Sequence, residues 1–296
     1  MIRRPPRSTQ GVSSAASDVY KRQERAEEFG KKYSVNSYNS IEILMENEDF
    51  DAAFVCTPTI THTEIAKELI ENKKHVFIEK PMTYLSEDGQ NLIEIAKKNN
   101  VVLTCGYIER FNPAVDTVKN FLKSKKYGEL IRLEFYREHR MPQHINDVGI
   151  IYDTSVHDID TAMWLFNETP EVVFARSGKI NHEHEDFATI MLGFKNNKIA
   201  TISSNWITPT RVRNFNAVCT DARIFSDFIT QEIRIETDKG SENYSGERKE
   251  PLSLEIKNFI DAIEGKNEII VKPEHAVNVT KTVSYTHLTL PTILLV

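Results

Sequence analysis

Three side chains that lie far apart in the sequence have types and spacings suited to proton transfer. Lys80 lies in the segment EKP at 79–81, directly after the apolar run 76–78, and Asp153 precedes His157 by four residues. On one helix, a carboxylate one turn before an imidazole can accept its N–H and fix which ring nitrogen is free. A lysine at a strand end is either solvated or directed into a cleft. An exposed Asp–His pair without a task would explain Asp153 and His157 equally well.

The segments that must position Lys80 alternate between strands and helices. Continuous apolar runs predict strands buried on both faces, and apolar residues at helical spacing lie between them. Short units of this kind form right-handed crossovers around a parallel sheet. The predicted strands are 51–59, 75–81 and 101–107, and the predicted helices are 24–35, 40–50, 61–74 and 86–100, with Ser40 and Ser86 as N-caps.

Three strand ends carry polar or special residues at the edge where such a sheet binds ligands. Ligands of doubly wound sheets lie beyond the carboxyl ends of the strands. At these ends the chain has Thr57-Pro58-Thr59, Glu79-Lys80-Pro81 and Gly106-Tyr107. One turn rich in Thr and Pro is ordinary, but three in succession indicate a binding site.

The chain after Tyr107 has a different pattern. It predicts a helix over 108–129 that ends at Gly128, a strand over 130–140, a helix over 153–167 and mostly alternating strands over 171–236. Alternation with one solvated face is typical of an antiparallel sheet. The expected fold class is therefore α/β: an incomplete doubly wound parallel sheet of the Rossmann type, followed by an α+β domain with a large, mostly antiparallel sheet.

Composition argues against several classes of protein. The 296 residues are 40% apolar and 27% charged, and no apolar run approaches the roughly 20 residues that span a bilayer. We therefore expect a cytoplasmic globular protein without a membrane partner. The net charge of −6 is a poor match for nucleic acid. Cys56, Cys105 and Cys219 are odd in number and far apart, which argues against a disulfide framework.

The histidines outside the DTSVHDID segment give weaker signals. The segment NHEHED at 181–186 has residue types that can bind metals, but such a run is more typical of a polar loop. We expect no metal site. His139 and His144 flank a short connection and either line the cleft or lie on the surface.

Four segments together resemble one known family. They are VCTPTITH at 55–62, EKP at 79–81, GYIERFNP at 106–113 and DTSVHDID at 153–160. In this order and spacing, the chain is similar to the glucose-fructose oxidoreductase/inositol dehydrogenase family (Gfo/Idh/MocA) over 24–283. The resemblance implies an NAD- or NADP-dependent dehydrogenase of a small-molecule sugar or nucleotide sugar, forming a homodimer or homotetramer. A non-catalytic regulator that binds dinucleotide or sugar is the alternative.

The resemblance also implies the site residues. Lys80, Asp153 and His157 would form the catalytic set, with either Lys80 or His157 taking the hydroxyl proton as hydride leaves. The nicotinamide side of the cofactor would be lined by Thr57, Pro58, Thr59, His62, Glu79 and Lys80. The expected substrate contacts are Tyr107, Arg110, Asn112, Arg140 and His144.

A narrower resemblance concerns the substrate. The segments 147–160, 185–194 and 203–215 look like the subgroup of UDP-N-acetylglucosamine 3-dehydrogenases, in which the C3 hydroxyl becomes a ketone. Under this interpretation Arg140, Arg211 and Arg213 are contacts for the substrate pyrophosphate or lie at the rim, although they could also be merely solvated. An inositol or free-sugar dehydrogenase is the alternative.

The chain departs from the family at its start. No two of its glycines are separated by one residue, so the G-x-G turn that holds a pyrophosphate at a helix N-terminus is absent. Residues 1–23 and 284–296 resemble translated sequencing-adapter read-through and are expected to be non-native tails. We expect a partial dinucleotide-binding domain at 24–107, a substrate-binding and oligomerisation domain at 108–283, weak or no NAD(H) binding, and an inactive chain. NAD and NADP cannot be distinguished.

Overall fold

The computed structural model describes residues 23–142, 148–286 and 294–295. The chain divides into two compact units, residues 1–51 and 52–296, and each is described separately. Most of the expected N-terminal tail and most of the expected C-terminal tail lie outside the described residues. Residues 284–286 form the end of helix α8.

The described part of the first unit is helical. One helix runs through residues 23–33, and α2 (Ile41–Asn47) follows. Ser40 is extended and its hydroxyl accepts a hydrogen bond from the N–H of Ile43 at 3.3 Å. The predicted N-cap at Ser40 is therefore confirmed, because it satisfies one of the free amides at the helix start.

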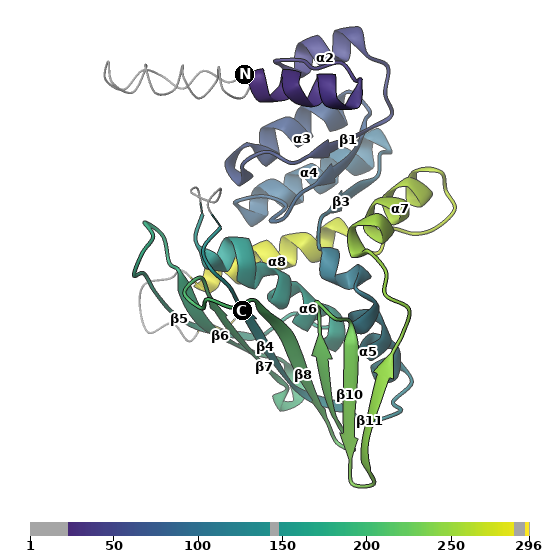
Figure 1. Ribbon diagram of the computed structural model, residues 1–296. Helices are drawn as coiled ribbons and strands as arrows, with labels where there is room; N and C mark the ends of the chain where they lie inside the picture. Colours follow the sequence, from purple (N-terminus) through teal and green to yellow (C-terminus); the bar gives the residue numbers. More distant parts are fainter. Residues whose placement is uncertain (1–22, 143–147, 287–293, 296) are drawn as a thin grey trace. The chain divides into compact units, whose positions relative to one another are not determined.

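The second unit begins with a three-stranded parallel sheet (Figure 1). Its order is β1-β2-β3, and helices α3 and α4 cross between the strands. No strand of the described residues pairs with the free edge of β1. The bounds are β1 (Ala52–Val55), α3 (His62–Glu71), β2 (His75–Ile78), α4 (Ser86–Asn99) and β3 (Leu103–Cys105). Ser86 is the first helical residue and Leu85 the N-cap, so the cap predicted at Ser86 is wrong by one position.

A nine-stranded sheet forms the rest of the second unit. Its order is β11-β10-β9-β8-β4-β7-β6-β5-β12, and every neighbouring pair is antiparallel except β4 with β7. The large, mostly antiparallel sheet is thus confirmed. The strands are β4 (Leu130–Glu138), β5 (Val172–Gly178), β6 (Phe187–Gly193), β7 (Ile199–Asn205), β8 (Val212–Cys219), β9 (Arg223–Asp227), β10 (Glu232–Thr237), β11 (Gly240–Ser245) and β12 (Leu294–Leu295).

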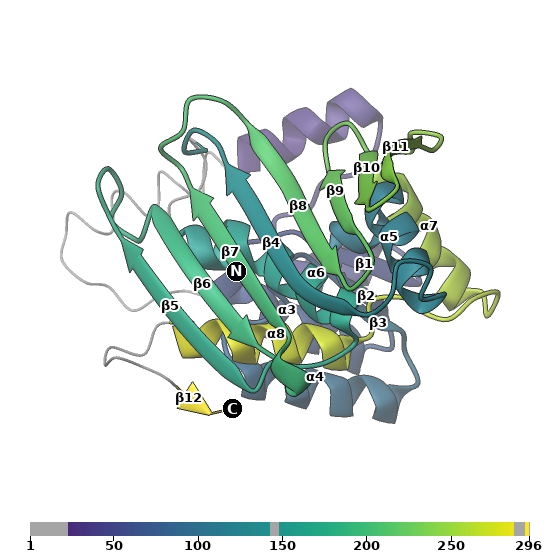
Figure 2. The same ribbon diagram turned by 90° about the horizontal axis from the view of Figure 1, so that it is seen from below.

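Helices cover one face of this sheet, which we call the inner face. Helices α5 (Pro113–Lys123), α6 (Val156–Phe166) and α8 (Pro273–Thr286) lie behind the strands in Figure 2. Side chains alternate along each strand, so Phe135 and Phe215 are buried on the inner face. On the opposite or outer face, no described helix covers the strands.

Two predicted helix boundaries near the site differ from the structure. The helix predicted over 108–129 is a short 3-10 turn (Ile108–Phe111) followed by α5, which begins at Pro113. The residue before a proline avoids helical dihedrals, and Asn112 is accordingly extended and caps α5. The helix predicted over 153–167 begins as a π-helical turn (Ile151–Ser155) and becomes α-helical only at Val156.

The helices after the large sheet return to the parallel sheet. On α7 (Pro251–Ile263), the ring of Phe259 lies 5.5 Å from Phe54 and 5.7 Å from Phe77. The Thr104 hydroxyl of β3 donates to the carbonyl of Val271 at 2.8 Å. The part of the chain from α7 to Val271 therefore packs against β1, β2 and β3. None of the described helices is both long and apolar enough to cross a membrane.

Candidate active site

The carboxyl ends of β1, β2 and β3 lie at one edge because the strands are parallel and in register. Thr57 and Pro58 are exposed after β1, while Thr59 is 7% exposed and begins the turn into α3. Lys80 follows β2 with 17% of its side chain exposed. The predicted convergence of these strand ends is thus present in the fold.

Lys80 connects this edge to the segment that enters α6. Its Nζ lies 2.8 Å from Oδ1 of Asp153 and donates to the Asp153 backbone carbonyl at 2.6 Å. Thr154 donates to the other carboxylate oxygen at 3.0 Å, and Trp206 donates to the Thr154 hydroxyl at 3.2 Å. Burial acts to raise the pKa of Asp153, but the charge and hydrogen bond of Lys80 outweigh it and the pKa falls below its ordinary value.

The expected hydrogen bond from His157 to Asp153 is not formed. The Asp153 carboxylate is taken up by Lys80 and Thr154, and Nδ1 of His157 is buried without a partner among the described residues. The physical reason is the π-helical turn, which widens the helix so that positions four apart no longer align. Burial, followed by the charge of Lys80, lowers the pKa of His157 well below its ordinary value. His157 is therefore neutral.

His62 holds two turns together and is 1% exposed. Its Nδ1 lies 3.0 Å from the carbonyl oxygen of Pro81, and its Nε2 lies 2.8 Å from that of Thr57. The ring thus ties the turn after β1 to the turn after β2, which fixes the backbone beside Lys80. Glu79 accepts from the Lys80 amide at 3.1 Å and supports the same turn.

Three predicted substrate contacts lie in the interior. Arg110 is 4% exposed, and its Nε donates to Asp160 at 2.8 Å. Asn112 is 2% exposed, caps α5 and donates to the carbonyl of Phe228 at 3.0 Å. Tyr107 is fully buried. Because neighbouring protein groups engage Arg110 and Asn112 and no side chain of the three reaches solvent, the structure does not support substrate contacts by them.

A second buried ion pair network was missed by the sequence reasoning. Arg137 is 1% exposed and donates to both Asp158 oxygens at 2.8–3.1 Å and to Glu109 at 3.0 Å. The alternation of β4 already places Arg137 on the side of Leu133 and Phe135, which is the signal that could have found it. Removing one partner of such a pair costs about 3–5 kcal/mol. The network therefore fixes α6, and with it His157, against the sheet.

The remaining predicted residues lie apart from this centre. Arg140 is exposed, its carbonyl lies 2.7 Å from Nδ1 of His139, and His144 lies outside the described residues. In the segment 181–186, Asp186 accepts the backbone N–H groups of Ile180 and Asn181, as a loop-stabilising residue does. Nowhere in the described ranges do three His, Cys, Asp or Glu side chains gather in a way that could hold a metal.

A buried acid on α7 was also not anticipated. Glu255 is 3% exposed, and its Oε1 has no hydrogen-bond partner among the described residues. Burial raises the pKa of Glu255 to about 9, and the negative charge of Glu79 adds to the effect. Glu255 is therefore a neutral carboxylic acid at neutral pH.

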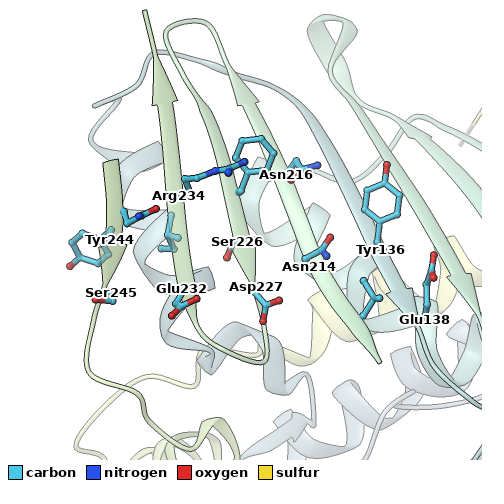
Figure 3. A pocket seen from close by; sticks show the side chains of 14 residues that line it. Tyr136, Glu138, Asn214, Asn216, Ser226, Asp227, Glu232, Arg234, Tyr244 and Ser245 are labelled. Atoms are coloured by element: carbon cyan, nitrogen blue, oxygen red, sulfur yellow. The ribbon is translucent and has the colours of Figure 1, made fainter. Parts of the chain in front are cut away.

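A hollow of about 760 Å³ lies on the outer face of the large sheet (Figure 3). Both polar and apolar side chains line it, and none of the residues predicted for the site, Lys80 included, is among them. The lining includes Tyr136, Glu138, Asn214, Asn216, Asp227, Arg234 and Tyr244. On β4 and β8 the lining residues alternate with buried ones, so the lining residues of these two strands belong to the outer face of the sheet.

A nicotinamide dinucleotide fits one part of this site and not another. At the strand-end edge, the exposed Thr57-Pro58 turn and the partly exposed Lys80 suit the nicotinamide end. No G-x-G turn exists anywhere in the sequence for the pyrophosphate. Gly106, after β3, cannot take that role because a Cβ there would lie 3.2 Å from Glu79 and Phe77, so the position is filled by packing. Among the described residues, those at this edge suit the reactive end of the cofactor.

The fold and these residues define a dinucleotide-dependent oxidoreductase. The model of the oxidoreductase family with an NAD-binding Rossmann fold, GFO_IDH_MocA, matches residues 9–107, and the model of the GFO/IDH/MocA C-terminal domain matches 115–225. The chain belongs to the Gfo/Idh/MocA family, as the sequence resemblance predicted. NAD or NADP as the cofactor of the family agrees with the prediction.

Several relatives are similar over most of the chain. Myo-inositol 2-dehydrogenase of Thermotoga maritima is 29% identical over 82% of this chain and 79% of its own length. UDP-N-acetylglucosamine 3-dehydrogenase of Acidithiobacillus ferrooxidans is 25% identical over 85% and 82%. The solved structure of that enzyme has a TM-score of 0.81 at 24% identity, covering 89% of this chain and 85% of that one. An uncharacterized oxidoreductase of Bacillus subtilis, YrbE, is 30% identical over 55% of this chain and 50% of its length.

Proposed function

We propose that this protein oxidises a secondary hydroxyl group of a sugar by hydride transfer to NAD or NADP, with Lys80, Asp153 and His157 at the reacting centre. The observation that carries the proposal is the 2.8 Å contact between Nζ of Lys80 and the Asp153 carboxylate. It brings the strand-end edge that suits nicotinamide next to the start of α6. The bound cofactor supplies the hydride acceptor.

The three side chains take different roles in this proposal. Lys80, which is paired with Asp153, donates a hydrogen bond to the hydroxyl oxygen. His157 is neutral and can accept the proton. Asp153 and His62 are positioning residues, because Asp153 fixes the Lys80 ammonium and His62 fixes its backbone.

For the substrate we favour C3 of a UDP-N-acetylhexosamine, as in the Acidithiobacillus ferrooxidans relative. An inositol or free sugar is the second candidate, supported by the Thermotoga maritima relative. Incubation with saturating NAD or NADP and a panel of UDP-sugars, inositols and hexoses tests both, with cofactor reduction as the readout. Cofactor binding without reduction by any of them would favour the non-catalytic regulator instead.

We also infer a homodimer or homotetramer that uses the outer face of the large sheet. That face exposes apolar side chains that a monomer would leave in water: Ile131, Tyr136, Phe174, Phe187, Met191 and Ile199, each between 36% and 43% exposed. Light scattering on the purified chain measures the state directly, and a monomer at micromolar concentration would reject it. The cytoplasmic location and the domain boundaries stay predictions.

A further inference from the structure

An arginine without a partner faces the proposed reacting centre from the large sheet. Arg213 is directly opposite Arg137 in the antiparallel pair of β4 and β8. Its neighbours Val212 and Asn214 line the outer hollow, so Arg213 projects from the inner face, where α6 lies. Arg137 in turn holds Asp158, the residue after His157. The register therefore places Arg213 beside the start of α6.

The two arginines differ in what they bind. The carboxylates of Asp158 and Glu109 are both engaged by Arg137. Nε of Arg213 is buried without a hydrogen-bond partner, and none of the described side chains forms an ion pair with its guanidinium. Arg213 is partly exposed, and because its buried Nε has no acceptor, a ligand that supplies oxygen atoms would be favoured there.

Other cations surround the same position. Burial, followed by the charges of Arg137 and Arg211, lowers the pKa of Arg213 to about 10, which still leaves it charged at neutral pH. His139 follows β4 and adds no positive charge at neutral pH, because burial lowers its pKa below the ordinary value. The charge of Arg213 also acts on His157. Since Asp153 is already paired with Lys80, this cluster has an excess of positive charge next to the reacting centre.

We propose that Arg213, assisted by Arg211, binds an oxyanion carried by the substrate, so that the protein selects anionic sugars over neutral ones. The group is a diphosphate or a carboxylate. Both present pairs of oxygen acceptors that can receive two parallel hydrogen bonds from a guanidinium group. The inference rests on the proposed function for the identity of the ligand as a sugar, whereas anion binding can be measured without turnover.

The test is calorimetric titration of the full chain with UDP, with glucuronate and with myo-inositol. Arg213→Gln removes the charge, and Arg176→Gln is the matched control, because Arg176 is an exposed arginine on β5. We expect UDP or glucuronate, but not myo-inositol, to bind, and Arg213→Gln to weaken binding by about tenfold or more. Arg176→Gln should bind as the unmodified chain does. The anion that binds more tightly identifies the group.

Two results would overturn the subsite: neither anion binds at millimolar concentration, or Arg213→Gln binds UDP and glucuronate as tightly as Arg176→Gln does. Thermal unfolding confirms that the variants are folded, and Arg213→Lys, which keeps the charge but not the fork, should bind with intermediate affinity. Failure of the proposed function looks different, because anions then bind in an Arg213-dependent way while no sugar is oxidised. Oxidation of neutral sugars alone, at a kcat/KM that Arg213→Gln does not change, contradicts the subsite and leaves the proposed function standing.

Discussion

Nζ of Lys80 lies 2.8 Å from Oδ1 of Asp153, and the same ammonium donates to the Asp153 carbonyl at 2.6 Å. These residues are separated by 73 positions, and the contact joins the end of β2 to the π-helical turn before α6. The contact holds the Lys80 side chain in one place. In the function that we propose, His157 is the base that accepts the hydroxyl proton.

Replacing Asp153 should leave the Lys80 side chain in the site but no longer hold its Nζ in position. We expect Asp153→Asn to lower kcat by about 100-fold, within the range for positioned proton-transfer groups, while KM for the sugar changes little. Lys80→Ala should lower kcat at least as much and also raise KM for the sugar, because it removes a direct contact to the substrate hydroxyl. Steady-state kinetics on both variants distinguishes the roles, and an Asp153→Asn enzyme as active as the unmodified one would contradict the assignment.

The stability of the chain should depend on pH through His157. Its pKa in the folded state lies well below the ordinary value of 6.5, so below about pH 6.5 the unfolded chain takes up a proton that the folded chain does not. The free energy of unfolding that the neutral imidazole contributes above about pH 6.5 is therefore lost as the pH falls below that value. Urea unfolding at about pH 7.5 and pH 5.5 should show a smaller decrease for His157→Asn. An equal decrease in both proteins would argue against a neutral buried imidazole.

Glu255 should have the opposite dependence. Its folded pKa is raised to about 9, so between about pH 4.5 and pH 9 the unfolded chain loses a proton that the folded chain keeps, and stability falls as pH rises. Glu255→Gln should be more stable than the unmodified chain at about pH 8, by on the order of 2 kcal/mol. The difference should vanish near pH 4.5. A variant that is less stable at both pH values would show that Glu255 is ionised and paired.

The affinity for the cofactor should be low because the sequence has no G-x-G turn for the pyrophosphate. We expect calorimetry to give a Kd for NAD(H) at least about tenfold weaker than that of the Thermotoga maritima relative, which corresponds to about 1.4 kcal/mol. Placing the strand, glycine turn and helix of that relative in front of residue 24 should raise the affinity to that of the relative. Equal affinity of this chain and its relative would show that other groups hold the pyrophosphate.

Much of this fold could be predicted from local patterns, and the failures have identifiable causes. Apolar runs at 52–55, 75–78 and 103–105 correctly indicated parallel strands, but β1 is not buried on both faces as predicted, because Phe54 is 46% exposed. The predicted pairing of Asp153 with His157 assumed that both residues lie on one α-helix. No local signal in the sequence indicates the π-helical turn that is present there. Arg110 is of a residue type that often binds ligands. Its partner in the structure is Asp160, 50 residues further along the chain, which the local sequence does not indicate. Such pairing depends on tertiary contacts.

The most direct test of the central claim is mass spectrometry of UDP-N-acetylglucosamine after incubation with excess NAD and the chain to which the strand, glycine turn and helix of the Thermotoga maritima relative have been added. The account predicts a keto sugar that has lost two hydrogen atoms, formed together with NADH and absent with Lys80→Ala. Arg176→Gln, with its change on the exposed face of β5, should form the product at the unmodified rate. If calorimetry shows the cofactor bound and neither this sugar nor any of the inositols and hexoses is oxidised, the account is contradicted.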